Sequence, residues 1–218
     1  SELKNKEQWE KAEISLPQFD RQAMKEETKK NPQWVHFGAG NIFRAFPAAL
    51  QQKLLNEGIE KTGIIVAEGY DYEIIKKAYR PQDDLSLLVT LKANGTIEKT
   101  VIGSLAESLT VDRHDAADWN RLKEIFASNT LQMVSFTITE KGYSITSPDG
   151  AFRADVKADF EAGPENADSY IGKLAALCYW RYTQGAAPLA LVSMDNCSHN
   201  GDKLFAAVDA YAKAWTEN

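Results

Sequence analysis

The sequence predicts an α/β protein with a mostly parallel sheet flanked by helices. Short apolar runs of strand length alternate with longer amphipathic runs along most of the chain. This alternation is typical of βαβ units, whose strands run parallel. The 218 residues are 44% hydrophobic and 26% charged, which is the composition of an ordinary globular protein.

Composition also excludes several classes of protein. A net charge of −6 argues against a nucleic-acid partner, and no apolar run reaches the length of a membrane span. The charged first residues differ from a secretory signal. Cys178 and Cys197 are too few for a disulfide framework or a zinc quartet, so we expect no metal and a reducing, cytoplasmic environment.

The first third of the chain contains an extension and the first βα unit. Residues 1–33 are polar and end in the turn signal Asn31-Pro32, which predicts an N-terminal extension packed on a domain spanning 34–218. A strand at 34–37 runs into glycines. The helix that follows is closed by Gly58, and it tolerates Pro47 if that residue lies in its first turn.

A second strand, at 64–67, precedes a helical stretch and then two β-rich runs. These runs flank Asn94-Gly95, the strongest short hairpin signal, and predict a β-hairpin that is an insertion or an extension of the sheet. Residues 144–167 are rich in Pro, Gly and Asp and predict a loop. The remaining alternation predicts helices at 115–128, 169–184 and 200–215, and strands at 131–139 and 189–194.

Candidate binding residues lie where strands end, because ligands of open parallel sheets bind at the carboxyl ends of strands. Gly38 and Gly40 occupy the first two positions of a G-x-G-x-x-G pattern, and Phe43 occupies the third. The first glycine permits a tight turn and the second permits a pyrophosphate to approach the helix N-terminus. A plain βα turn is the alternative interpretation.

Two further strand ends carry polar side chains. Glu68 ends the second strand, where a carboxylate binds the ribose 2′-OH and favours NAD over NADP; a solvated carboxylate is the alternative. Asn196 follows the last strand, where an amide can stabilise an oxyanion or, alternatively, cap the next helix. His36 is predicted to be a core residue, and Lys141 has no assigned role.

Three segments together resemble one family. H-F-G-A-G-N-I-F-R-A at 36–45, I-T-E-K-G-Y at 138–143 and V-S-M-D-N-C-S-H-N-G-D at 192–202 are similar to the polyol-specific long-chain dehydrogenases, the mannitol dehydrogenase and fructuronate reductase (mannonate oxidoreductase) family. The resemblance covers residues 30–218 and the family's N-terminal half. It implies a Rossmann-like domain, an NAD cofactor, and interconversion of a polyol or sugar acid with its keto form.

The resemblance also implies a set of site residues. Asn196 would hold the reacting oxygen, and the cofactor contacts would be Gly38, Gly40, Asn41, Phe43, Arg44, Glu68, Thr139 and Glu140. The general-base lysine lies in the family's helical C-terminal domain, which is absent from these 218 residues, so we expect this chain alone to be inactive. Ile42 to Phe46 depart from the family's F-H-R-A-H stretch and leave the substrate open. A non-catalytic NAD-binding module is the alternative function.

Overall fold

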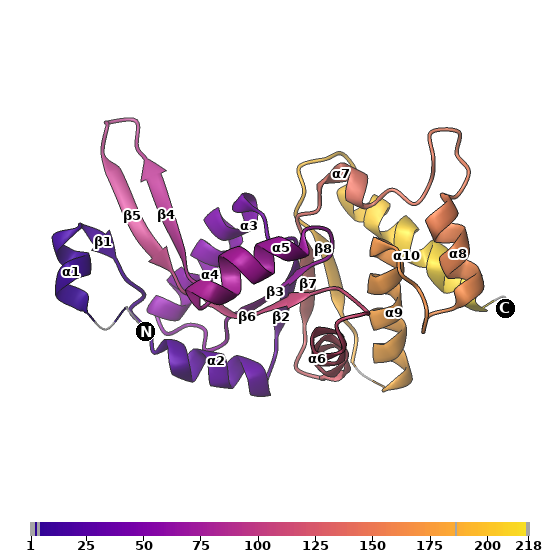
Figure 1. Cartoon of the computed structure of the whole chain (residues 1–218), viewed down its shortest axis with the longest axis horizontal. Coiled ribbons are helices and arrows are strands. Elements are labelled where there is room, and N and C mark those ends of the chain that lie inside the picture. Colours follow the sequence, from indigo (N-terminus) through magenta and orange to yellow (C-terminus); the bar gives the residue numbers. More distant parts are fainter. Residues whose placement is uncertain (1–2, 4, 186, 217–218) are drawn as a thin grey trace.

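The computed structural model describes residues 3, 5–185 and 187–216. Its centre is a five-stranded sheet with the order β6-β3-β2-β7-β8 (Figure 1). All four pairs of neighbouring strands are parallel. This confirms the predicted fold class. The strands are β2 (Trp34–Phe37), β3 (Ile64–Glu68), β6 (Leu105–Thr110), β7 (Met133–Phe136) and β8 (Ala190–Ser193).

Alternate residues of the strands face two different cores. Ile64 and Val66 of β3 pack beneath α4 (Pro47–Asn56) and the π-helical segment Ile75–Tyr79, which continues α5 (Tyr72–Ile74) and precedes a 3-10 turn (Arg80–Gln82). Ile65 and Ala67 face the opposite side. The core on that side includes residues of α6 (Ala116–Ala127), α9 (Tyr170–Thr183) and α10 (Asn200–Thr216).

Two of the predicted elements have a different form in the structure. The predicted first helix is two helices, α3 (Asn41–Ala45) and α4, because Pro47 opens a new helix where its missing N–H costs nothing. The predicted loop at 144–167 contains α8 (Ala154–Ala162).

Strand β6 was not predicted. It forms one edge of the sheet, where its L-A-E-S-L-T sequence pairs with β3. Its polar side chains are satisfied by distant partners. Arg121 donates to the Glu107 carboxylate at 2.9 Å, and the Ser108 hydroxyl donates to Asp84 at 2.6 Å.

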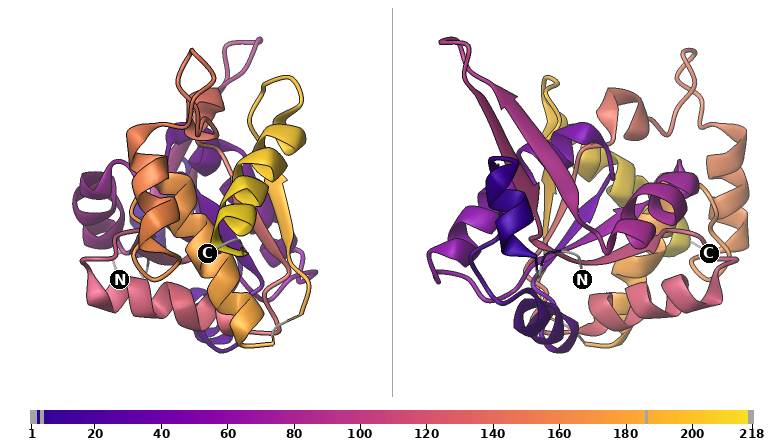
Figure 2. Two further views of the ribbon diagram at one scale, coloured as in Figure 1. Left: turned by 90° about the vertical axis from the view of Figure 1, so that its right-hand side faces the viewer. Right: turned by 60° about the vertical axis from the view of Figure 1, so that its left-hand side comes forward.

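The predicted hairpin is confirmed, and it stands apart from the central sheet. β4 (Ser86–Leu91) and β5 (Ile97–Ile102) pair antiparallel, and β1 (Ile14–Ser15) pairs parallel with β5. The hairpin projects well beyond the rest of the domain (Figure 2). It is therefore a second, separate sheet and not an extension of the first.

The N-terminal segment contains α1 (Lys6–Lys11), β1 and α2 (Arg21–Lys30). α2 buries Met24 and Thr28, and the Thr28 hydroxyl accepts a hydrogen bond from the Gly63 N–H at 2.8 Å, just before β3. This segment is therefore tied to the central sheet. Among the described residues, no helix combines the length and apolar character that crossing a membrane requires.

Candidate functional site

The turn after β2 depends on a glycine at position 38. Gly38 has φ +110°, and a Cβ there would lie 2.3 Å from the carbonyl oxygen of Thr137. The Gly38 N–H donates to the Ala67 carbonyl at 2.9 Å, which places the turn between the ends of β3 and β7. At this point the strand order reverses direction, and open α/β sheets bind ligands at such a reversal.

Gly40 lies in a different environment from Gly38. It is exposed, its φ of −73° is ordinary, and a Cβ there would meet nothing within 4 Å. Gly40 caps the N-terminus of α3, whose first N–H groups have no partner within the helix. A side chain added at Gly40 would therefore begin in open space next to the N-terminus of α3.

The Glu68 carboxylate holds this loop in place. One oxygen accepts from the Ala39 N–H at 2.8 Å, and the other accepts from Tyr70 at 2.8 Å and Asp71 at 3.3 Å. Glu68 is only 7% exposed, so the alternative of a solvated carboxylate is wrong. A carboxylate accepts about four hydrogen bonds, which leaves capacity for one more.

Phe43 does not line the loop, contrary to the prediction that it contacts a cofactor. The residue is 0% exposed, and its ring stacks on that of His36 with centroids 4.2 Å apart. An aromatic ring therefore fills the packing space at the third position of the glycine pattern.

His36 is the predicted core histidine, and the structure confirms this. Its two ring nitrogens lie 2.7 Å from the Ser135 hydroxyl and 2.8 Å from the Thr137 hydroxyl. Burial lowers its pKa to about 3. The ring is therefore neutral at physiological pH, and it joins β2 to β7.

Arg44 and Asn41 lie together at the start of α3. The Arg44 guanidinium donates to the Asn41 side chain at 2.5 Å and lies over the Tyr79 ring at 5.6 Å. Its Nε is buried and has no hydrogen-bond partner among the described residues. A buried guanidinium N–H without an acceptor is suited to a ligand oxygen.

Asp195 organises the loop on the other side of the reversal, a role that sequence reasoning missed. From the end of β8, its carboxylate accepts from the Ile138 N–H at 2.9 Å and the Thr139 N–H at 3.0 Å. It also accepts from the Tyr143 hydroxyl, whose pKa is raised by burial and by this bond. Thr139 has φ +63°, a strained conformation for a β-branched residue. Asn196 follows Asp195 and is exposed.

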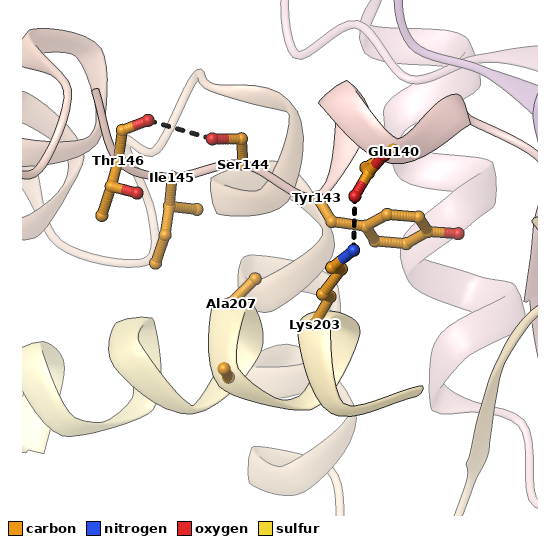
Figure 3. A pocket seen from close by; sticks show the side chains of 8 residues that line it. Glu140, Tyr143, Ser144, Ile145, Thr146, Lys203 and Ala207 are labelled. Carbon is orange, nitrogen blue, oxygen red and sulfur yellow. Dashed lines mark hydrogen bonds and ion pairs between the residues drawn. The ribbon is translucent and has the colours of Figure 1, made fainter. Parts of the chain in front are cut away.

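The remaining predicted residues belong to α7 (Thr139–Gly142). Glu140 is exposed and forms an ion pair with Lys203 of α10, which lowers the pKa of the Glu140 carboxyl. The pair lies beside a hollow of about 430 Å³ between α7 and α10 (Figure 3). Lys141 is also exposed. The hollow is lined by Glu140, Tyr143, Ser144, Ile145, Thr146, Lys203, Ala206 and Ala207.

The buried hydroxyl of Tyr170 interacts electrostatically with both Glu68 and Asp195. Tyr170 begins α9, and its hydroxyl oxygen is buried without a hydrogen-bond partner among the described residues. Burial raises its pKa, and the carboxylates of Glu68 and Asp195 act in the same direction. Within the described part of the chain, no group of three or more His, Cys, Asp or Glu side chains is arranged to hold a metal ion.

These features define a class of protein. A parallel sheet with this strand order, a glycine turn at its reversal and an acidic residue at the end of the neighbouring strand form a Rossmann-type dinucleotide-binding domain. The chain belongs to the mannitol dehydrogenase family, because the family's Rossmann domain matches residues 32–218.

Individual relatives agree with this assignment. The chain is 46% identical to D-mannonate oxidoreductase of Thermotoga maritima, over 99% of this chain and 40% of the relative. It is 31% identical to a Polyol:NADP oxidoreductase of Gluconobacter oxydans, over 93% of this chain and 41% of the relative. The chain therefore spans about two fifths of the length of these relatives.

Solved structures give the same result. A D-sorbitol dehydrogenase in substrate-free form superposes with a TM-score of 0.78 at 30% identity, covering 94% of this chain and 41% of that one. The mannitol 2-dehydrogenase of Pseudomonas fluorescens, solved with NAD and D-mannitol, gives 0.77 at 28% identity, covering 94% and 40%. The resemblance expected from the three sequence motifs is thus confirmed.

Proposed function

We propose that this chain is the NAD(H)-binding part of an oxidoreductase that interconverts a polyol or sugar acid with its keto form. The observation that carries the proposal is the glycine turn at Gly38, held by Glu68 at the reversal of the sheet. The identity of 46% to a D-mannonate oxidoreductase favours D-mannonate and D-fructuronate as the substrate pair. Mannitol and fructose are the second candidate pair, supported by the likeness to mannitol 2-dehydrogenase.

The residues present fit a dinucleotide. The open space at Gly40, the buried Nε of Arg44 and the unpartnered hydroxyl of Tyr170 are suited to anionic or hydroxyl oxygens. In this proposal Gly38, Gly40, Asn41 and Arg44 surround the pyrophosphate, Glu68 binds the adenosine ribose, and Thr139 and Glu140 lie toward the nicotinamide. The nicotinamide, when bound, supplies hydride transfer.

Asn196 has the catalytic role in this proposal. Its exposed amide follows β8 and can donate a hydrogen bond to the substrate oxygen as negative charge develops there. Asp195 positions the neighbouring loop by accepting two of its backbone N–H groups. The general base and the second wall of the substrate cleft would come from a helical C-terminal domain of a longer protein. Both cysteines are free thiols, in keeping with a cytoplasmic setting.

The cofactor preference is tested by titrating NADH and NADPH by calorimetry. We expect tighter NADH binding, because the Glu68 charge repels a 2′-phosphate. Glu68→Gln should reduce the difference between the NADH and NADPH affinities. The amide of the glutamine keeps one carbonyl oxygen, which can still accept a hydrogen bond from the loop. Asp71→Asn is the matched control, since it removes a neighbouring exposed charge that does not hold the loop. Tighter binding of NADPH by the wild-type chain would overturn the preference.

Gly40→Val tests the pyrophosphate position. A Cβ at this position meets no atom within 4 Å and the backbone φ is ordinary, so the fold should persist. NADH binding should be lost, because the added side chain would occupy the space of the ligand. Unchanged affinity would show that Gly40 belongs to an ordinary turn.

Activity is tested by comparing the 218-residue chain with a longer gene product, using mannonate, fructuronate, mannitol and fructose. We expect turnover only in the longer protein, since proton transfer by a general base contributes about 10²–10⁴-fold. Asn196→Ala in that protein should lower kcat by about 10²–10³-fold. Robust turnover by the 218-residue chain would overturn the assignment of the base to another domain.

A further inference from the structure

Tyr70 presents a fixed, exposed aromatic face beside the proposed ribose site. It follows Glu68 and Gly69 directly after β3 and is 60% exposed. One face of its ring stacks on Tyr170, with centroids 4.4 Å apart and planes 10° from parallel. Exposed aromatic residues are common on protein surfaces, so exposure alone indicates nothing. The unusual feature is that Tyr170, stacked on one face of the ring, fixes the orientation of Tyr70.

Two separate contacts fix the ring. The Tyr70 N–H donates to the Glu68 carboxylate at 2.8 Å, which ties its backbone to the same group that holds the glycine turn. Tyr170 beneath it is 9% exposed and packs edge-on against Phe37 of β2, with centroids 6.3 Å apart. Tyr70 therefore rests on the core of the domain.

Gly69 makes this stacking possible. A Cβ at position 69 would lie 2.4 Å from Cε2 of Tyr170. Its φ is not in the left-handed region, so the glycine is needed for space and not for backbone conformation. The E-G-Y sequence thus places an acidic group, a gap for the buried tyrosine and an exposed ring in consecutive positions.

We propose that the exposed face of Tyr70 is the stacking surface for the adenine of the dinucleotide. This inference rests on the proposed function. Adenine is bonded to C1′ of the ribose whose 2′-hydroxyl would donate a hydrogen bond to Glu68, so the base must lie within one sugar of that carboxylate. Tyr70 is hydrogen-bonded to the same carboxylate and offers a flat apolar face there. Aromatic side chains bind nucleobases by such stacking without reading base edges.

The test measures binding of AMP, nicotinamide mononucleotide and NADH to the 218-residue chain by calorimetry. Tyr70→Ala should weaken AMP and NADH binding by the same factor, about 5- to 100-fold. Nicotinamide mononucleotide should bind as before, because it carries no adenine. Tyr70→Phe should bind AMP within about threefold of wild type, since stacking does not use the hydroxyl.

A matched control separates stacking from a general loss of surface tyrosine. Tyr182, near the C-terminus of α9, is 80% exposed and lies outside the proposed site, so Tyr182→Ala should leave every affinity unchanged. Thermal melting of each variant checks folding, and Tyr70→Leu, which keeps apolar contact with Tyr170, provides a second truncation of the stacking face.

The outcomes distinguish this inference from the function on which it rests. Wild-type AMP affinity in both Tyr70→Ala and Tyr70→Leu would overturn the stacking role and leave NAD binding intact. Equal weakening of nicotinamide mononucleotide would also overturn it, because the effect would then not be specific to adenine. Failure of the wild-type chain to bind either NADH or AMP would overturn the proposed function, and the role of Tyr70 with it.

Discussion

The two halves of the candidate site are held in different ways. On the β2–β3 side, Gly38 and the Glu68 carboxylate fix a turn through backbone groups at the ends of adjacent strands. On the β7–β8 side, the Asp195 side chain reaches across to the loop that begins at Ile138. Both halves use a carboxylate to hold a loop, but only the first also depends on a missing side chain, at Gly38. A glycine turn is a local feature of sequence, but a bridging carboxylate is not.

The largest effect should come from Gly38→Ala. The new Cβ would collide with the Thr137 carbonyl in a backbone conformation that L-residues avoid, so we expect a loss of about 2–5 kcal/mol in unfolding free energy. Gly40→Ala, with open space and ordinary φ, should change stability by less than about 0.5 kcal/mol. Urea denaturation measures both, and equal effects would contradict the distinction between the two glycines.

Asp195→Ala should destabilise the second half by a smaller amount. It removes the acceptor of two backbone N–H groups and of the Tyr143 hydroxyl, with an expected cost of about 1–3 kcal/mol. Hydrogen exchange should accelerate at Ile138 and Thr139 and remain unchanged at Ala39. If exchange instead rises equally at Ala39, the two halves are one cooperative unit.

His36 lies at the boundary of the halves and makes stability depend on pH. Its pKa is about 3 in the folded chain because burial disfavours the charged ring, against about 6.5 when unfolded. The unfolded state therefore binds the extra proton first, and stability falls as pH decreases from about 6.5 toward 3. The slope is at most about 1.4 kcal/mol per pH unit. His36→Gln should flatten the curve in that window, and unchanged slopes would contradict this origin.

The smallest effect is expected from the ion pair of Glu140 with Lys203. Both side chains are on the surface, where solvent screens the attraction. Glu140→Gln should leave the Tm of the chain unchanged, and the same variant can be tested for altered NADH affinity. A marked fall in Tm would show that this pair, and not Asp195 alone, holds α7 in place.

The sequence by itself determined the features that depend on local backbone chemistry. The alternation of apolar runs predicted the parallel sheet, Asn94-Gly95 predicted the hairpin, and the glycine pattern predicted the turn at Gly38. Each is encoded within a few consecutive residues, because strand periodicity and turn conformation are set by neighbours along the chain.

Only the tertiary structure decided which side chains meet. It placed Phe43 in the core and β6 at the edge of the sheet. It also made Asp195 the anchor of the loop at Ile138 and stacked Tyr170 against Tyr70. These outcomes depend on partners brought from distant parts of the chain, such as Ser108 with Asp84 or Asp195 with Ile138. A polar residue is stable in the interior only when it has such a hydrogen-bond partner. The local sequence pattern does not show which distant residue that partner will be.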